Sequence, residues 1–425
     1  MQRLSIALLV LLALYFAHQL LRDDPLLPEA QQWLAITNQQ PDLDNNALIY
    51  LLGLDQAGVD YANALQLYQQ ALQDKSYSSP PLHYPRLPGL RTVELATLDC
   101  QLTTPECQQH LLVQRQETEF VIQQYQASLA AFYKLLSFDN FTNVDTFITK
   151  PQFDELTKLY RLAANEIYYL ITDNQLDEAA SKLAALLTIE RSLMRNSAEM
   201  ILHVFPIINA ESLYQPLIVK LHQAGFKKWA VFDIALAPLS NEERLMNKVW
   251  QFEFANQVNA MQNILQVQNI NYLSYKPNMT INILAKYYQT YMPSEDITPM
   301  ELLAVIETSK LQTEAFAEEA RTAQQPWRFK FYNYRNIAGT LLAYTIRPRV
   351  LDFQTHKLEL DLRLQLLDAV VHTTRAADLD TDRYRNPYTG QPSYLNERQL
   401  CHKLEQEICV PWPHGQQTTL TSAEQ

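Results

Sequence analysis

The hydrophobic pattern of this chain starts with an apolar run at residues 4–21 (LSIALLVLLALYFAHQLL), which contains no charged side chain. A helix of this length would span roughly 27 Å, close to the hydrocarbon thickness of a bilayer. A cleavable signal peptide needs small side chains at the last and third-last positions before the cut, but a cut after Ala17 would place the bulky Tyr15 third from last. We therefore predict an uncleaved transmembrane anchor.

The charges on either side of this run predict its orientation. Arg3 precedes it and Arg22 follows it, while residues 23–74 contain eight acidic side chains and no Lys or Arg. Positive charge is what retains a flanking segment in the cytoplasm, so this acidic segment is readily translocated. We expect a bacterial inner-membrane protein with residues 1–3 in the cytoplasm and the bulk of the chain in the periplasm.

Behind the anchor, apolar side chains recur at spacings of three and four residues, which is typical of amphipathic helices. The predicted helices cover residues 47–54, 60–74, 108–138, 153–172, 176–196, 240–268, 278–291, 299–323 and 349–376. The first pair and the pair within 153–196 form helical hairpins similar to tetratricopeptide units, although no 34-residue period accompanies them. The pattern therefore predicts an all-α fold, an irregular multi-helix bundle with hairpins.

One segment carries two signals. Leucine occupies every second position from 358 to 366, and a period of two is typical of a strand. The run contains no β-branched residue, however, and Glu359 and Arg363 form the i,i+4 pair that stabilises a helix. We therefore predict that 349–376 is a central helix.

Two helix starts are marked by capping residues. Ser240 with Glu243 forms a capping box, which predicts that a helix begins there. Asn278 is the predicted cap of the helix that runs to residue 291.

Prolines and polar segments divide the chain into regions. Residues 22–45 contain three prolines and are predicted to be a juxtamembrane linker with one short helix around Trp33, and four prolines make residues 75–92 a Pro-rich loop. The remaining regions are a helical domain at 46–376, whose subdivision near residue 150 is left open, a C-terminal strap at 377–415 and a polar, disordered tail at 416–425.

The amino-acid composition limits both the fold classes and the function classes that fit this chain. Seven glycines in 425 residues are too few for hairpin-rich β folds or phosphate-binding loops, which supports the all-α prediction. The net charge of −12 and the pI near 5.3 argue against a nucleic-acid surface. The aromatic and basic segment at 326–335 (PWRFKFYNYR) therefore favours a packed aromatic corner, or a contact with a partner or with lipid headgroups.

The four cysteines lie in two close pairs, which outside the cytosol indicates two local disulfides. These are Cys100 with Cys107, and Cys401 with Cys409. The alternative for the second pair is a metal site completed by His402 and His414, but that spacing matches no common zinc pattern. We therefore predict two small disulfide loops.

Motifs that carry chemistry are sparse. The sequence has no H-E-x-x-H, no phosphate-binding loop, no G-x-S-x-G and no dinucleotide fingerprint, so we predict no cofactor and no familiar catalytic centre. Asp378, Asp380 and Asp382 have the spacing of the first half of a calcium loop. Arg383 stands where that loop needs glycine and Thr389 where it needs an acid, so a solvated turn is the alternative interpretation.

A seven-residue turn motif (NPYTGQP) follows, with its key positions at Asn386, Pro387, Tyr388, Gly390 and Pro392. Asn-Pro initiates a turn, and the glycine can adopt a positive φ. We expect a rigid turn that straps the C-terminal segment onto the helical bundle.

This motif resembles one in a group of uncharacterised, membrane-anchored, all-helical bacterial envelope proteins, whose C-terminal segments carry Asp/Asn-Pro-aromatic-Ser/Thr-Gly-Lys-Pro. Gln391 stands here in place of the lysine. The K-P-N-x-T pattern at 276–280 is similar to that group as well. The resemblance implies a membrane-anchored helical domain without an assigned activity, and it transfers no catalytic residue.

These patterns favour a non-enzymatic scaffold or adaptor that binds other envelope proteins through helical-hairpin surfaces, with the membrane as its other partner and no nucleic acid. Two alternatives stay open. A helical ligand-binding or sensing domain would have a deep pocket lined by Tyr and Trp. An uncharacterised envelope hydrolase or transferase would bring acids or histidines with shifted pKa values into one cleft.

Overall fold

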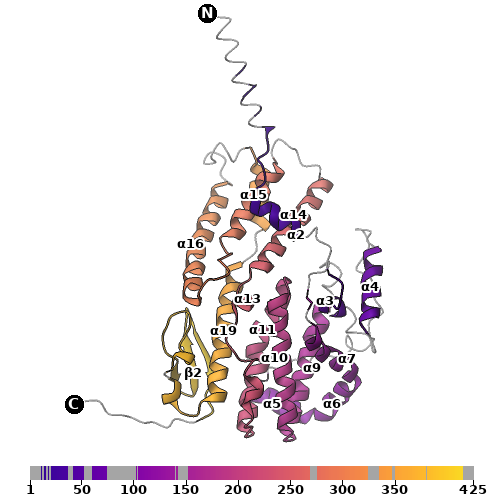
Figure 1. The fold of residues 1–425 in the computed structure, drawn as a ribbon, viewed down its shortest axis with the longest axis vertical. Coiled ribbons are helices and arrows are strands. Elements are labelled where there is room, and N and C mark those ends of the chain that lie inside the picture. The colour runs from indigo at the N-terminus through magenta and orange to yellow at the C-terminus, as the bar shows by residue number, and fades with distance from the viewer. Residues whose placement is uncertain are drawn as a thin grey trace, which may run out of the picture. The chain divides into compact units, whose positions relative to one another are not determined.

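Figure 1 shows the fold in a computed structural model of the chain. The structure describes residues 21–36, 42–51, 60–73, 102, 104–138, 140–141, 152–268, 275–323, 335–346, 350–379 and 381–414, together with residues 11, 14, 15 and 18. This part of the chain is mostly helical and contains one small three-stranded sheet, which confirms the predicted all-α class in its main feature. The predicted Pro-rich loop and polar tail lie outside the described residues.

The predicted anchor at 4–21 also lies mostly outside this part of the chain. The residues of it that the structure describes are helical and exposed; they are Leu11, Leu14, Tyr15, His18 and Leu21. Within the described ranges, no helix combines the length and the apolar character that a membrane crossing requires.

The chain divides into two compact units. Unit 1 comprises residues 1–40, 245–297 and 301–354, and unit 2 comprises residues 41–244, 298–300 and 355–425.

Unit 1 consists of α2 (Pro28–Ile36), α14 (Asn247–Gln268), α15 (Pro277–Gln289), α18 (Ile337–Ile346) and most of α16 (Pro299–Ala323). α2 packs against α14 and α15, and α15 packs against α18. Trp33 of α2 meets Phe254 of α14 edge-on, with 5.2 Å between the ring centroids. The short helix predicted around Trp33 is therefore α2, and this part of the predicted linker is packed into unit 1.

α15 and α18 approach each other closely at Gly339 of α18. A Cβ atom there would lie 1.9 Å from Thr280 Oγ1 and 2.2 Å from Asn336 Oδ1. Asn336 Oδ1 also accepts a hydrogen bond of 2.7 Å from the backbone amide of Lys276. Glycine is therefore required at 339 because the K-P-N-x-T segment of α15 occupies the space that a side chain would need.

Unit 2 is an irregular helical bundle around α10 (Leu176–Asn196), which contacts α9, α11 and α13. Figure 1 shows α9, α10 and α11 next to one another in this unit. Its other helical elements are α3 (Ala47–Leu51), α4 (Tyr61–Gln73), α5 (Pro105–Val113), α6 (Arg115–Gln124), α7 (Gln126–Tyr133), η2 (Lys134–Ser137), α9 (Gln152–Thr172), α11 (Met200–Asn209), the π-helical turn η3 (Ala210–Tyr214), α12 (Gln215–Gln223), η4 (Trp229–Phe232), α13 (Asn241–Arg244), η6 (Ala376–Leu379), η7 (Asp382–Tyr384) and, from residue 355 onward, α19 (Val350–His372).

Several predicted helices are confirmed. The hairpin of α9 and α10 turns where predicted, at Asp173 and Asn174, and Asn174 adopts φ 59°. The segment with alternating leucines is helix α19 and not a strand. Its leucines from 358 to 367 are all buried, so the alternation reflects a helix that packs on more than one face.

The helix predicted at 108–138 is interrupted. It begins earlier, at Pro105, and is divided into α5, α6 and α7 by breaks at Gln114 and Tyr125, whose ψ angles are 16° and 14°. A helical ψ is near −42°, so each break turns the chain. Because the hydrophobic spacing continues across both breaks, the pattern alone did not reveal them.

The capping box at Ser240 is confirmed, but the helix that it opens is short. Ser240 N donates to Glu243 Oε2 at 2.8 Å, and Glu243 N donates to Ser240 Oγ at 3.3 Å. The prediction of one helix over 240–268 is wrong, because α13 ends at Arg244 and α14 begins at Asn247. The side chains of α13 are drawn into buried ion pairs, which are described below.

The C-terminal strap contains the sheet, which the sequence pattern did not predict. β1 (Tyr394–Asn396), β2 (Gln399–Lys403) and β3 (Glu407–Pro411) are antiparallel in the order β1-β2-β3. Cys401 and Cys409 face each other across β2 and β3 and form the predicted disulfide. Strands of three to five residues leave too short an alternation to be recognised.

Candidate functional site: a buried ionic network in unit 2

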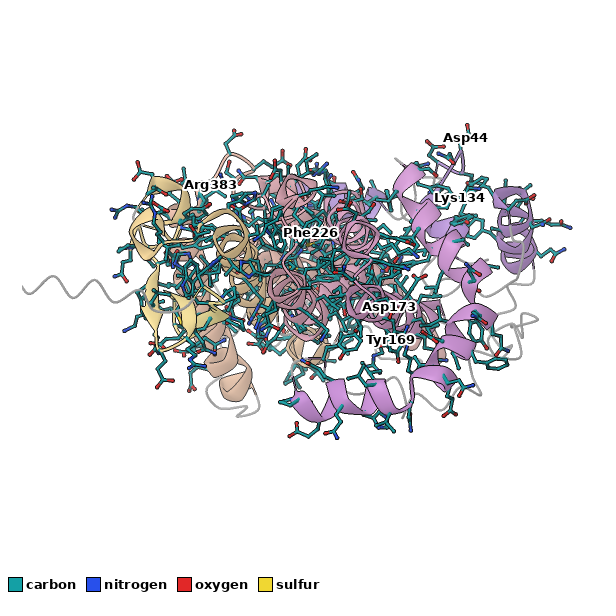
Figure 2. All side chains as sticks on the ribbon, turned by 90° about the horizontal axis from the view of Figure 1, so that it is seen from below. Asp44, Lys134, Tyr169, Asp173, Phe226 and Arg383 are labelled. Carbon is teal, nitrogen blue, oxygen red and sulfur yellow. A yellow bond between two sulfur atoms is a disulfide. The ribbon has the colours of Figure 1, made fainter. Side chains whose placement is uncertain are left out.

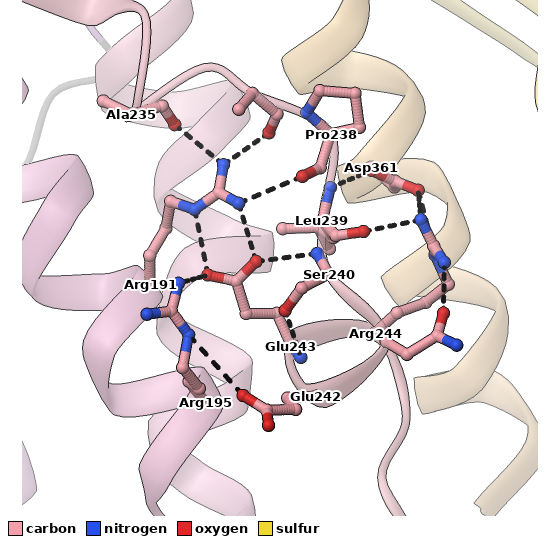
Figure 3. Close-up of polar contacts among 12 residues, drawn as sticks. Arg191, Arg195, Ala235, Pro238, Leu239, Ser240, Glu242, Glu243, Arg244 and Asp361 are labelled. Atoms are coloured by element: carbon pink, nitrogen blue, oxygen red, sulfur yellow. Dashed lines mark hydrogen bonds and ion pairs between the residues drawn. The ribbon is translucent and has the colours of Figure 1, made fainter. Parts of the chain in front are cut away.

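The most concentrated polar cluster among the described residues joins α10, α13 and α19 (Figure 3). α10 supplies Arg191, α13 supplies Glu243 and Arg244, and α19 supplies Lys357 and Asp361. All five residues are buried, with exposed fractions of 8% or less. Buried charges are expected to be paired and hydrogen-bonded, since an unpaired charge in the core costs several kcal/mol.

Arg191 and Glu243 form the first half of the network. Arg191 Nε donates to Glu243 Oε1 at 3.0 Å and Nη2 donates to Glu243 Oε2 at 2.6 Å, a two-pronged ion pair. The remaining Arg191 donors bond the backbone carbonyls of Ala235, Ala237 and Pro238. Arg191 thus holds both α13 and the loop before it against α10.

These contacts lower the pKa of Glu243. Burial raises this pKa, but the hydrogen bonds and charge of Arg191, the Ser240 amide and the Arg195 guanidinium outweigh that effect and hold it below its ordinary value. Arg195 Nη2 lies 2.9 Å from Glu243 Oε1. The carboxylate is therefore ionised at neutral pH and surrounded by donors.

Arg244 and Asp361 form the second half. Arg244 Nε donates to Asp361 Oδ2 at 3.1 Å, and Asp361 Oδ1 accepts from the Leu239 amide at 2.7 Å. Tyr388, from the predicted turn motif, donates its hydroxyl to Asp361 Oδ2 at 2.6 Å. The network therefore connects the 235–244 segment and the C-terminal strap to α19. Its role is to stabilise the fold.

A second group of buried ionisable residues lies close by. Burial raises the pKa of Glu190 to about 8, although its hydrogen bond from Asn209 lowers it in part. Asn209 Nδ2 donates to Glu190 Oε1 at 2.6 Å. Burial lowers the pKa of Lys357 to about 7, opposed by the charges of Glu243, Glu190 and Asp361.

His203 belongs to the same group. Its Nε2 donates to the carbonyl of Ser197 at 2.9 Å, and burial together with the charge of Lys357 lowers its pKa well below the usual value. Glu190, His203 and Lys357 thus bring an acid, a base and a cation into one buried region. The adjoining cavity, however, holds only about 10 Å³ and is lined by Glu190, Arg191, Tyr214 and apolar side chains. That is room for one water molecule at most, and not for a substrate.

A larger hollow lies elsewhere in unit 2, next to the sheet. It is an open groove of about 940 Å³ lined by Val219 and Gln223 of α12, the β1–β2 turn and the segment after β3 that contains Trp412. His414 stands beside it, with ring centroids 4.6 Å from Trp412 and 4.3 Å from His222. The groove is large enough for a small ligand.

The turn motif is formed as predicted. Asn386 Oδ1 accepts from the amides of Tyr388 at 2.9 Å and Thr389 at 3.3 Å, and Gly390 adopts φ 70°. Asn386 Nδ2 donates to the Lys403 carbonyl at 2.9 Å, which ties the turn to β2. The turn also contains Pro387 and leads through Pro392, which forms an isolated bridge with Arg385.

The cysteine and calcium predictions have different outcomes. Because Cys401 and Cys409 are disulfide-bonded, the zinc alternative with His402 and His414 is wrong: His402 Nε2 lies 2.9 Å from Gln365 Oε1 and His414 Nε2 bonds the Val370 carbonyl. Cys107 is disulfide-bonded, and its predicted partner Cys100 lies outside the described residues.

In the calcium candidate, Asp378 pairs with Arg375 at 2.9 Å and Asp382 lies 3.4 Å from Arg385 Nε, while Asp380 lies outside the described residues. No group of three metal-binding side chains occurs in the ranges that the structure describes. The two aspartates that can be placed therefore make arginine contacts, which supports the solvated-turn interpretation.

The chain matches no protein-family model, no curated protein and no solved structure. Its site must therefore be interpreted from its own geometry. Sequence reasoning identified Glu243 only as a capping residue and Tyr388 only as part of a turn, and it missed Arg191, Arg244 and Asp361. No local signal marks these three, because their charged partners lie 52 and 117 residues away.

Proposed function

We propose that this protein is a membrane-anchored scaffold of a bacterial envelope, which carries a helical body in the periplasm and binds protein partners through it. The observation behind this proposal is a set of large apolar side chains that stay exposed on the helical segment at the start of unit 1. Leu11, Leu14, Tyr15 and Leu21 have exposed fractions of 64%, 61%, 59% and 51%. Water disfavours such a gathering, whereas a bilayer would cover it.

A second set of exposed apolar side chains, in unit 2, supports the partner-binding part of the proposal. Leu112 and Val113 at the end of α5 and Phe120 of α6 are exposed by 49%, 77% and 67%. We call them the α5–α6 patch. Large apolar side chains that stay exposed on a surface are typical of protein-binding sites.

The helices of the α5–α6 patch are firmly held, as a docking surface should be. Tyr169, in the last turn of α9, and Asp173, directly after that helix, are labelled in Figure 2. Tyr169 donates to the Leu111 carbonyl at 2.9 Å, and Arg115 of α6 donates to both Asp173 oxygens at 2.7 and 2.5 Å. Binding at this patch would therefore need little ordering of the free protein.

Photo-crosslinking in cells tests this function. A photoreactive phenylalanine analogue at Phe120 should give discrete crosslinked species with envelope proteins, in cells whose membranes retain the chain after alkaline washing. The same analogue at Ser181, an exposed polar position of α10, is the matched control. Identical crosslinking at both positions, or release of the chain by the wash, would refute the proposal.

The groove beside the sheet favours a second candidate, a ligand-binding or sensing domain. Trp412 and Arg398 line it, so an aromatic face and a charged donor are both available to a small polar ligand. Titration with fractionated periplasmic metabolites should then change tryptophan fluorescence in a saturable way. The change should disappear in Arg398→Ala, and a response that this variant retains would assign it to another site.

A further inference from the structure

The segment that follows the apolar run is clasped by α15 of unit 1. Asp23 Oδ2 accepts from the Asn278 amide at 2.9 Å, and Asp23 Oδ1 accepts from the Met279 amide at 3.1 Å. Asn278 Nδ2 returns a hydrogen bond of 2.8 Å to the Asp24 carbonyl. The helix predicted to be capped by Asn278 begins one residue earlier, at Pro277, and a carboxylate from 255 residues away caps it.

Two further side chains complete this clasp. Arg335, next to α18, donates to the Arg22 carbonyl and lies 3.4 Å from Asp24 Oδ1. Asn282 of α15 donates to the Pro25 carbonyl at 2.9 Å and accepts from the Leu27 amide at 2.9 Å. Hydrogen bonds therefore hold the stretch from Arg22 to Leu27 against α15 and Arg335 along its whole length.

The clasp fixes how far unit 1 can lie from the apolar run. Consecutive Cα atoms are about 3.8 Å apart, so Asp23 is at most about 8 Å from Leu21, the last residue of that run. The headgroup layer on each side of a bilayer is roughly 5–8 Å thick. A chain anchored through the run must therefore bring the first turn of α15 to the depth of the headgroups.

We propose that the end of unit 1 formed by residues 22–25, 276–279 and 335–336 lies in the headgroup layer of the bilayer. Unit 1 then sits directly on the membrane and is not suspended from it. Arg22 is exposed at this end, where its guanidinium can meet lipid phosphates. This placement rests on the membrane anchoring proposed above, and it adds a lipid surface to the partners of the protein.

Depth measurement on the full-length chain in vesicles tests the placement. Single fluorophores are attached at Pro277→Cys, in the first turn of α15, and at Gln289→Cys, at the other end of the same helix, about 18 Å away. The vesicles are phosphatidylethanolamine and phosphatidylglycerol with a quencher on the headgroup. Quenching should be several-fold stronger at position 277 than at 289, and the unsubstituted chain serves as the labelling control.

A clasp variant separates this proposal from the anchor itself. In Asp23→Ala/Asn282→Ala, quenching at position 277 should fall toward the value at 289, while the chain stays with the vesicles. If quenching is equally weak at positions 277 and 289 of the chain that keeps Asp23 and Asn282, and this chain stays with the vesicles, the headgroup placement alone is overturned. Loss of the chain from the vesicles would overturn the anchor, and the placement with it.

Discussion

Tyr388 and Asp361 are joined by a hydrogen bond of 2.6 Å, in which the phenolic hydroxyl donates to Asp361 Oδ2. Both residues are buried, and they lie 27 positions apart in the chain. Tyr388 belongs to the turn motif and Asp361 to α19. This contact therefore connects the C-terminal strap to the ionic network in the core of unit 2.

We expect Tyr388→Phe to lower the free energy of unfolding by about 1–3 kcal/mol, because the buried Asp361 carboxylate loses a donor. Urea denaturation followed by circular dichroism measures this change. Tyr394→Phe is the control, since its hydroxyl bonds Glu407 at an exposed position and its loss should cost less than about 1 kcal/mol. Equal losses in the two variants would contradict the role given to Tyr388.

Glu243→Gln should destabilise the chain by about 3–5 kcal/mol, because it leaves the buried Arg191 without its charge partner. The same denaturation experiment measures the effect. Glu242→Gln is the matched control one residue away: its carboxylate is exposed and lies 4.0 Å from Arg195. A change below about 1 kcal/mol in Glu243→Gln would show that the pair contributes no more than a surface ion pair.

Glu190 should make stability fall as the pH rises. Its pKa is about 8 in the folded chain, above the ordinary value of 4.5. Between these values the folded chain keeps a proton that the unfolded chain has lost, so the contribution of Glu190 is complete below pH 4.5 and is lost as the pH rises through about 8. Glu190→Gln should flatten this slope in denaturation curves recorded from pH 5 to 8.

Lys357 should make stability rise as the pH rises. Its pKa is lowered to about 7 from 10.5, so its contribution is complete above pH 10.5 and is lost as the pH falls through about 7. Lys357→Met, which keeps the length of the side chain, should flatten the rise in stability from pH 7 to about 10 and leave the slope at lower pH unchanged. An unaltered profile in either variant would mean that the residue does not titrate in this range.

Gly339→Ala should destabilise unit 1 by about 1–3 kcal/mol or more, because the new methyl group would overlap Thr280 Oγ1 and Asn336 Oδ1. Thermal unfolding should show a lower midpoint. Thr345→Ala, on the exposed face of the same helix, is the control and should change the midpoint little. A stabilised Gly339→Ala variant would indicate that α15 and α18 can separate at no cost.

The predictions that succeeded depend on short-range physics. The α9–α10 hairpin, the helical identity of α19, the Ser240 capping box and the Asn386 turn all follow from spacings of two to four residues. The Cys401–Cys409 disulfide follows from a spacing of eight residues. Over such distances the identities of neighbouring side chains largely decide the backbone, so the pattern can be interpreted without knowing the fold.

What only the tertiary structure decided involves partners far apart in the chain. Arg191 meets Glu243 across 52 residues, Arg244 meets Asp361 across 117, and Asp23 caps α15 across 255. Apart from Glu243, which belongs to the capping box, none of these side chains is marked by a local sequence signal. The amino-acid sequence by itself determined the helical class and the short turns, whereas packing determined which charges were buried together, because burial depends on what the rest of the chain places beside them.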